Sequence, residues 1–132
     1  MESIEVTREA LERLLHEAEA ASPEEACGLL LGQKGRIERI VPALNVHPEP
    51  LRHFEIDPQA LIDAHRAARA GGREVLGYYH SHPTGLAEPS AADCEAAAGD
   101  RRVWAIVAAG EVRIWRDGDD GFVALSTRAV SG

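Results

Sequence analysis

The sequence predicts an α/β domain in which a mixed β-sheet is flanked by helices. Short apolar runs that suit strands alternate along the chain with longer stretches whose apolar residues recur at helical spacing. Glycines, prolines and other turn residues separate these segments, and no internal repeat or linker interrupts them. Because 132 residues can enclose one sizeable core but not two, we expect a single domain over residues 1–132.

The first part of the chain is expected to form a strand, a helix and a β-hairpin. Residues 4–6 alternate between apolar and polar and predict a short edge strand, and Thr7 is a typical N-cap for the helix that follows. Residues 26–32 are an apolar run with glycines, which is typical of a central strand with close backbone packing. The turn at 33–35 should fold residues 36–41 back onto that strand.

A loop and a second helix are expected in the middle of the chain. Prolines break residues 45–50, and a loop of this kind can be mobile or can meet a substrate. Its His47 and the nearby His53 are expected to be surface residues rather than metal ligands. Residues 54–56 predict a short strand, and residues 57–70 predict a helix whose Asp-Pro start suits the N-cap and N1 positions.

The last part of the chain adds four strands and one more helix. An apolar strand ends at the sequence His80-Ser81-His82-Pro83, and an alanine-rich helical pattern opens at Ser90 and closes at Gly99. Further strands are expected over residues 103–107, 111–116 and 122–125. The resulting order, β-α-β-β-α-β-α-β-β-β, implies a mixed sheet covered by helices.

Charge and composition exclude several classes of function. The chain has 14 basic and 22 acidic residues, a net charge of −8 and no basic cluster, so a nucleic-acid backbone would be repelled. No apolar run approaches a membrane span and the first residues lack a signal-peptide pattern, so we expect a cytoplasmic protein with no membrane or nucleic-acid partner. Cys27 and Cys94 show no CxxC or disulfide spacing and are expected to be buried, reduced thiols.

Two histidines one residue apart, His80 and His82, end an apolar strand. Strand alternation places both imidazoles on one face and Ser81 on the other. Pro83 has no N–H group and therefore ends the strand at this point. Taken alone, such a pair is typical of solvent-facing or hydrogen-bonded histidines.

Asp93 adds a carboxylate behind a loop that contains proline and glycine. Ser90 and Asp93 match a helix capping box, which explains both residues without any ligand role. The two interpretations are compatible, because the amide dipoles at a helix start keep an aspartate ionised. Since the histidine pair and this carboxylate occur together, we predict a metal site, with zinc as the first candidate and a fourth position open to water.

A hydrolytic zinc site also needs a carboxylate that moves a proton. Zinc lowers the pKa of bound water to about 7 and polarises a carbonyl beside it, and the carboxylate passes the proton of the water to the leaving amine. Glu25 is attractive because it stands at the start of the central strand, although, taken alone, it is more simply explained as a solvated acid after a helix. Spacing alone leaves several candidates open, namely Glu24, Glu25, Glu55, Glu88 and Glu95.

These segments together resemble the JAMM/MPN-plus metalloprotease family, and in particular its small, stand-alone prokaryotic members. Residues 23–32, Pro-Glu-Glu-Ala-Cys-Gly-Leu-Leu-Leu-Gly, look like the glutamate-bearing strand of that family. The segments 80–83 and 90–93 match its signature with the expected spacing. The resemblance covers nearly all of the chain, and a motif with this many fixed points is specific.

The resemblance implies a role for each residue of the site. It makes His80, His82 and Asp93 the ligands of one zinc ion per chain. It makes Glu25 the general acid/base and Ser90 the donor that steadies a tetrahedral oxyanion. It also implies the cytidine-deaminase-like three-layer JAMM/MPN fold. The chain shows no departure at these positions, which argues against the metal-free MPN relatives that act as scaffolds.

The resemblance further implies a substrate class. Members of the family cleave peptide or isopeptide bonds after the C-terminal Gly-Gly of ubiquitin or ubiquitin-like proteins. For a compact prokaryotic type, the expected substrates are ubiquitin-like sulfur-carrier proteins or their conjugates, whose extended tails can lie along a sheet edge. The chain lacks the long insertions of larger relatives, so we expect it to accept varied tails with weak affinity. Its oligomeric state is left open, a homodimer included.

Three other interpretations use the same residues differently. A non-haem iron oxygenase also binds its metal with two histidines and a carboxylate, but usually with a different ligand order. A zinc-dependent base deaminase would need a Pro-Cys-x-x-Cys sequence, which this chain does not have. The remaining alternative is a non-catalytic MPN-type module that binds ubiquitin-like tails without cutting them.

Overall fold

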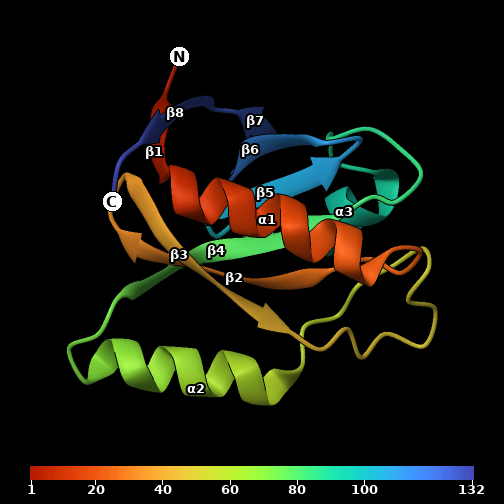
Figure 1. Ribbon diagram of the computed structural model, residues 1–132, viewed down its shortest axis with the longest axis horizontal. Helices are drawn as coiled ribbons and strands as arrows, with labels where there is room; N and C mark the ends of the chain where they lie inside the picture. Colours follow the sequence, from red (N-terminus) through yellow and green to blue (C-terminus); the bar gives the residue numbers. More distant parts are fainter.

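One eight-stranded mixed sheet forms the centre of the fold. The computed structural model describes all 132 residues, and the strands run in the order β7-β6-β5-β4-β2-β3-β1-β8 (Figure 1). The strands are β1 (Ser3–Thr7), β2 (Cys27–Gln33), β3 (Arg36–Ala43), β4 (Glu74–Ser81), β5 (Val103–Ala108), β6 (Glu111–Gly118), β7 (Gly121–Ala124) and β8 (Ser126–Val130). The helices are α1 (Arg8–Ala21), α2 (Pro58–Arg69) and α3 (Ala91–Ala96). The predicted α/β class with a mixed sheet is confirmed.

Helices cover both faces of the sheet, so the fold has three layers. Helix α1 packs on the face that carries the larger core, in which Leu14 meets Leu30 and Tyr79 among others. Helix α2 lies on the other side of the sheet (Figure 1), over a smaller cluster that includes Cys27 and Leu29. Because side chains alternate along a strand, Tyr79 and its neighbour His80 face opposite layers. His80 therefore lies on the face of α2 and α3.

The local sequence explains where the two longer helices start. Thr7 Oγ1 accepts a hydrogen bond of 3.1 Å from the Ala10 N–H group. Asp57 Oδ1 accepts one of 3.2 Å from Gln59 N–H, and Pro58 fills the first helical position. Both predicted N-caps are confirmed. None of the helices is long and apolar enough to cross a membrane.

The antiparallel pairing of β2 with β4 positions the candidate site. Cys27 lies opposite His80, and Gly28 lies opposite Tyr79. A Cβ atom on Gly28 would collide with the Val41 carbonyl oxygen and the Tyr79 ring, which confirms the predicted close packing. On its other side β4 pairs in parallel with β5. The end of β4 is therefore held between two strands in the middle of the sheet.

The edge of the sheet differs from the prediction. β1 pairs in parallel with both β3 and β8. The strand predicted at residues 4–6 is therefore confirmed, but its predicted edge position is wrong, because β8 is the edge strand. Residues 126–130 gave no strand signal because their side chains are almost all exposed and carry no apolar alternation. The expected strand at 54–56 is also wrong, since only an isolated bridge joins Asn45 to Ile56. Strand pairing here depends on distant partners rather than on local pattern.

The third helix is shorter than predicted. It ends at Ala96 instead of continuing to Gly99. The buried Asp117 carboxylate accepts hydrogen bonds from the Ala98 and Gly99 N–H groups at 3.0 and 3.1 Å, which draws these residues out of the helix. Cys94 on this helix is exposed, so its predicted burial is wrong, whereas Cys27 is buried as expected.

Candidate metal centre

Three side chains converge where β4 ends and α3 begins. The Nε2 atoms of His80 and His82 are 3.0 Å apart, and each lies 3.1 Å from Asp93 Oδ2. Bonds of about 2.1 Å in tetrahedral zinc geometry separate the ligand atoms by about 3.4 Å. The structure thus brings together the three residues that the sequence singled out, within a few tenths of an ångström of the spacing that one zinc ion would give.

A strand end and a capping box orient these side chains. His82 N–H donates to the Val107 carbonyl oxygen at 2.8 Å, which continues the sheet one residue past β4. Ser90 Oγ accepts from Asp93 N–H at 3.1 Å, and Asp93 Oδ2 accepts from Ser90 N–H at 2.9 Å. The same oxygen of Asp93 faces both imidazoles. The capping role and a ligand role are therefore geometrically compatible.

The two imidazoles are held in different ways. His82 Nδ1 lies 2.7 Å from the Leu86 carbonyl oxygen and must donate to it, so Nε2 of the neutral ring carries a lone pair. The His80 ring is fully buried and stacks on Phe54 with a centroid distance of 4.2 Å. Trp104 meets it edge-on, and His80 Nδ1 has no hydrogen-bond partner. Packing, rather than a hydrogen bond at Nδ1, fixes the direction of His80.

The donor set fits a cation. With both rings neutral, only His80 can place a proton among the three facing atoms. If that proton is on His80 Nε2, His82 Nε2 and Asp93 Oδ2 meet as two acceptors only 3.1 Å apart. A cation bound to all three atoms removes this conflict. Two imidazole nitrogens and a carboxylate oxygen suit a borderline divalent ion such as zinc.

Glu25 is the only buried residue among the glutamates that the sequence left open as a base. Its exposed fraction is 7%, whereas the other four are exposed, namely Glu24, Glu55, Glu88 and Glu95. The ligand atoms of Glu25, His80 and His82 all lie within 4.8 Å of one another. A carboxylate this close to the imidazoles can exchange a proton with a group bound there, directly or through one water.

The two carboxylates of the site are driven to opposite protonation states. Burial raises the pKa of Glu25 to about 7, with a smaller opposing effect of His82. Burial also acts on Asp93, but the two imidazoles and the Ser90 N–H group that face its carboxylate outweigh burial and hold the pKa of Asp93 well below its usual range. Burial lowers the pKa of His80, whereas in His82 the interaction with Asp93 outweighs burial and raises the pKa.

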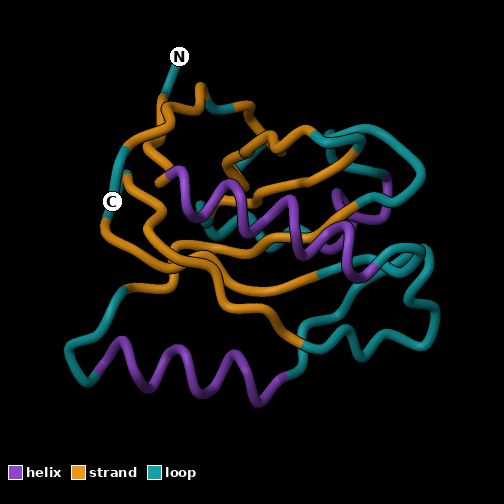
Figure 2. Tube along the Cα trace, in the orientation of Figure 1, coloured by secondary structure: helices purple, strands orange, loops and turns teal.

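Two pockets flank Glu25 at one end of the molecule, where the loops before β2, after β3 and after β4 gather (Figure 2). The first pocket has a volume of about 410 Å³, and His82 and Ser90 also line it. Leu51 and Leu86 belong to its lining and are 57% and 69% exposed. An extended polar chain with an apolar residue could lie in such a pocket beside Glu25.

The second pocket, of about 350 Å³, lies between Glu25 and Asp93 and is bordered by His47 and His53. The rings of these two histidines are 4.8 Å apart, and both residues are half-buried. Neither belongs to the group of side chains whose ligand atoms converge.

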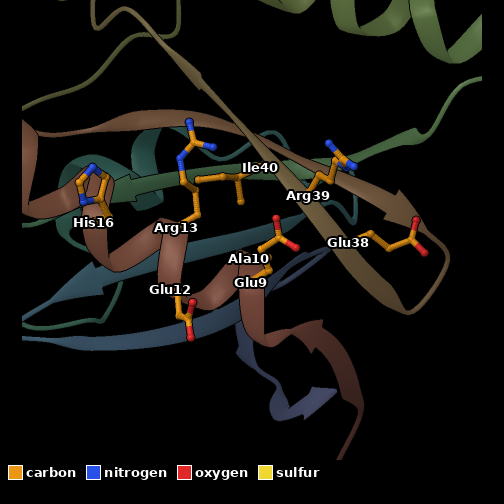
Figure 3. Close-up of a pocket in the computed structure, with 8 residues that line it drawn as sticks. All are labelled: Glu9, Ala10, Glu12, Arg13, His16, Glu38, Arg39 and Ile40. Carbon is orange, nitrogen blue, oxygen red and sulfur yellow. The ribbon is translucent and has the colours of Figure 1, made fainter. Parts of the chain in front are cut away.

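A third hollow lies between α1 and β3, on the opposite face of the sheet (Figure 3). His16 and Glu38 stand at its two ends. Two of its charged side chains pair with residues outside the hollow, since Arg73 contacts Glu38 at 3.1 Å and Glu17 faces Arg13 at 3.7 Å. The hollow brings no set of ligands together and shares no residue with the site.

Sequence reasoning missed three residues that support the site. Phe54 packs on His80, the Leu86 carbonyl orients His82, and the Asn45 amide ties the 45–56 loop to the backbone of Glu25. All three lie in loops. Phe54 and Asn45 contact partners that are distant in sequence, and Leu86 acts through its backbone carbonyl group, which no side-chain pattern marks. The one available signal was that Asn45 is the only asparagine of the chain.

We expect the metal-free Glu25→Gln variant to be more stable than the metal-free wild type above pH 7. The pKa of Glu25 is raised in the folded state, so its favourable contribution is complete below pH 4.5 and is lost as the pH rises to about 7. Glutamine has no proton to lose. Since one pKa unit corresponds to about 1.4 kcal/mol, the gain at pH 8 is at most roughly 3 kcal/mol.

Urea unfolding of the chelator-treated proteins at pH 5 and pH 8 measures this difference. The difference in the free energy of unfolding between the two proteins should be small at pH 5 and larger at pH 8. An equal difference at both pH values would show that the Glu25 carboxylate is not in a desolvated environment.

Comparison with known proteins places these features in a family. Residues 7–118 match the family described as prokaryotic homologs of the JAB domain. A Thermus thermophilus protein named "Probable TtuB-protein conjugate cleaving protease" is 44% identical over 84 residues, 64% of this chain and 53% of that protein. A desampylase of Haloferax volcanii is 36% identical over 89 residues, 64% of each chain. The chain thus spans between about half and two thirds of these curated relatives.

Solved structures share the fold. The solution structure of a protein from Desulfitobacterium hafniense has a TM-score of 0.85 and 30% identity, covering 98% of this chain and 94% of that one. A JAB1/MPN domain protein from Archaeoglobus fulgidus has a TM-score of 0.63 at 19% identity, covering 96% and 98%, and shows likeness of fold alone. With most of its length matched by the family and the same architecture throughout, the chain belongs to the prokaryotic homologues of the JAB domain, the JAMM/MPN type that its motif predicted.

Proposed function

We propose that this protein is a zinc-dependent peptidase or isopeptidase that cuts after the C-terminal Gly-Gly of a ubiquitin-like, sulfur-carrier type of protein. The observation that carries the proposal is the convergence of His80, His82 and Asp93 with the buried Glu25 beside them. The relatives named for cleaving TtuB-protein conjugates and as desampylases support the substrate class.

His80, His82 and Asp93 would hold one zinc ion per chain. The ion, when bound, supplies Lewis-acid activation of a water molecule and of the carbonyl group to be attacked. The residues of the chain do the rest. Asp93 stays ionised because its hydrogen bonds hold its pKa low, and Leu86 keeps the His82 ring in one tautomer.

Glu25 would move the proton. Its pKa of about 7 lets it accept a proton from the attacking water near neutral pH and give it up to the leaving amine. A group with an ordinary carboxylate pKa would accept a proton less readily.

Ser90 would stabilise the charge that develops on the attacked carbonyl oxygen. Its Oγ accepts the Asp93 N–H group, which leaves the hydroxyl proton free to donate outward. The residue is exposed and lines the same pocket as Glu25 and His82. A hydrogen-bond donor at this position would stabilise the negative oxygen of the tetrahedral intermediate more than the uncharged carbonyl oxygen of the substrate.

The first pocket suits an extended tail. Glycines have no side chains, so a Gly-Gly segment can pass close to Glu25 and His82 where bulkier residues would be blocked. Leu51 and Leu86 can contact an apolar side chain upstream of that segment. The body of the ubiquitin-like protein would remain outside the pocket.

The proposal is tested with a ubiquitin-like protein whose Gly-Gly terminus carries a C-terminal extension, incubated with zinc-loaded enzyme and analysed by intact-mass spectrometry. Wild type should release the extension after the second glycine. Glu25→Gln should keep one zinc per chain but lose roughly 10²- to 10⁴-fold in rate. Asp93→Ala should lose both the zinc and the activity.

Glu24→Gln is the matched control, because it makes the same change at the exposed neighbouring glutamate. It should leave zinc content and rate within about twofold. An intact substrate that nevertheless binds zinc-loaded wild type would replace the proposal with the non-catalytic binding module.

Ser90 variants separate its capping role from its role as a donor. Ser90→Ala should lower kcat roughly 10²- to 10³-fold at unchanged zinc content. Ser90→Thr, which keeps the hydroxyl, should retain most activity. Ser90→Asp keeps an oxygen that can cap α3 but has no proton to donate, so it should remain folded and inactive. Full activity of Ser90→Asp in steady-state kinetics would remove Ser90 from the reaction.

Apolar contacts at the pocket should affect substrate affinity rather than chemistry. Leu51→Ala and Leu86→Ala should each raise KM about three- to tenfold with kcat within about twofold, since each removes part of a leucine burial. The Leu86 change keeps the backbone carbonyl that orients His82. Ile62→Ala is the control, because Ile62 is an apolar residue on α2 that is 47% exposed and lies outside both pockets. Equal KM values for all three variants would place the tail elsewhere.

A further inference from the structure

The loop between β3 and α2 is closed at its neck. Asn45 and Ile56 form an antiparallel bridge, and Val46 N–H donates to the Glu55 carbonyl oxygen at 2.9 Å. One residue further out, Asp57 N–H donates to the Leu44 carbonyl oxygen at 3.1 Å. The segment 45–56 is therefore a fixed loop, although its prolines also allowed a mobile one.

The Asn45 side chain holds this loop together from inside. Its Nδ2 group donates to the carbonyl oxygens of Glu25 and His53 at 3.1 and 3.0 Å. Its Oδ1 atom accepts from the N–H groups of His47 and Glu55, both at 3.1 Å. An amide has two donor protons and two acceptor lone pairs, so all of its hydrogen-bonding capacity is used.

Both backbone polar groups of Glu25 are bound to the same loop. Glu25 N–H donates to the Pro50 carbonyl oxygen at 2.8 Å, and the Glu25 carbonyl oxygen accepts from Asn45. Glu25 precedes β2, and the hydrogen bonds between this segment and β4 stop at the next residue, Ala26, which binds Ser81. Glu24 just before it is exposed. The loop therefore binds the backbone groups of Glu25 itself, where the sheet has ended.

The proposed metal ligands depend much less on this loop. His80 and His82 come from the end of β4, and Asp93 comes from the capping box of α3. The loop reaches them only through the packing of Phe54 on the His80 ring. Loosening the loop at Asn45 should therefore move Glu25 before it disturbs the metal site.

We propose that Asn45 is a positioning residue that clamps the 45–56 loop onto the backbone of Glu25 and so aims the Glu25 carboxylate at the metal centre. This inference rests on the proposed function for the part that Glu25 plays. Asn45 lines neither of the two pockets beside Glu25. Its effect is geometric, because misplacing a catalytic group by about 1 Å can cost about 10²-fold in rate.

The first test measures backbone exchange and needs no substrate. Asn45→Asp keeps the acceptor oxygen but loses both donated hydrogen bonds, and Asn45→Ala loses all four without adding charge. Native-state hydrogen exchange followed by NMR should show the Glu25 amide exchanging about tenfold faster or more in both variants. The Ile106 amide in β5 should be unchanged. Gln59→Glu, the same amide-to-acid change at an exposed site on α2, is the control.

The second test uses the zinc-loaded enzyme and the substrate with a C-terminal extension. Asn45→Asp and Asn45→Ala should lower kcat about 10- to 100-fold, with KM within about threefold and zinc content unchanged. In the Glu25→Gln background the same substitutions should change the residual rate by less than about twofold, because the clamp acts through Glu25.

Unchanged exchange at Glu25, loss of zinc in step with loss of kcat, or independent effects in the Glu25→Gln background would each overturn the inference. If wild type cuts no substrate, the proposed function fails. The exchange experiment still decides whether Asn45 holds Glu25, so the two failures are distinguishable.

Discussion

Two hydrogen bonds between Ala26 and Ser81 determine whether this site exists. Ala26 N–H donates to Ser81 Oγ at 2.8 Å, and Ser81 N–H donates to the Ala26 carbonyl oxygen at 3.0 Å. They fix the start of β2 against the end of β4, so that alternation brings Glu25 and His80 to one face. A slip of one residue would turn every side chain of β2 to the other face and carry Glu25 into the core under α1. Ser81, which lies between the two histidines, thus has a structural role: it sets the register of β2 against β4.

The opposite behaviour of the two carboxylates follows from their hydrogen bonds. Asp93 receives donors from a helix start and faces two imidazoles, which stabilise its charge despite burial. The Glu25 carboxylate has no hydrogen-bond donor within the protein, so burial dominates and favours the protonated form. When the environments of two carboxylates push their pKa values apart, one can remain a fixed negative charge while the other carries a proton. Here the start of α3 supplies the environment of Asp93, and the closed 45–56 loop helps to bury Glu25.

The sequence predicts the parts of the site that depend on local pattern. The alternation around Ser81, the capping box at Ser90 and the strand end at Pro83 are all short-range, and the structure agrees with each. The sequence could not choose Glu25 over the other glutamates without the family resemblance, because burial depends on the 45–56 loop closing over it. Asn45, Phe54 and β8 were missed for the same reason: their partners lie far away in sequence, and neither apolar period nor turn chemistry marks them.

The two imidazoles are oriented in different ways, and only one of them leaves a polar atom without a hydrogen bond. His82 is held by a hydrogen bond to a carbonyl oxygen, the common arrangement, which also satisfies its second nitrogen. His80 leaves Nδ1 without a partner, and a buried unpaired polar atom costs about 1–3 kcal/mol. Phe54 and Trp104 confine the ring instead, so its Nε2 atom cannot turn away from Asp93. These aromatic walls also keep water from the imidazole and strengthen its interaction with charge. Because Phe54 belongs to the loop that anchors Glu25, one segment fixes the proton carrier through hydrogen bonds and a candidate ligand through packing.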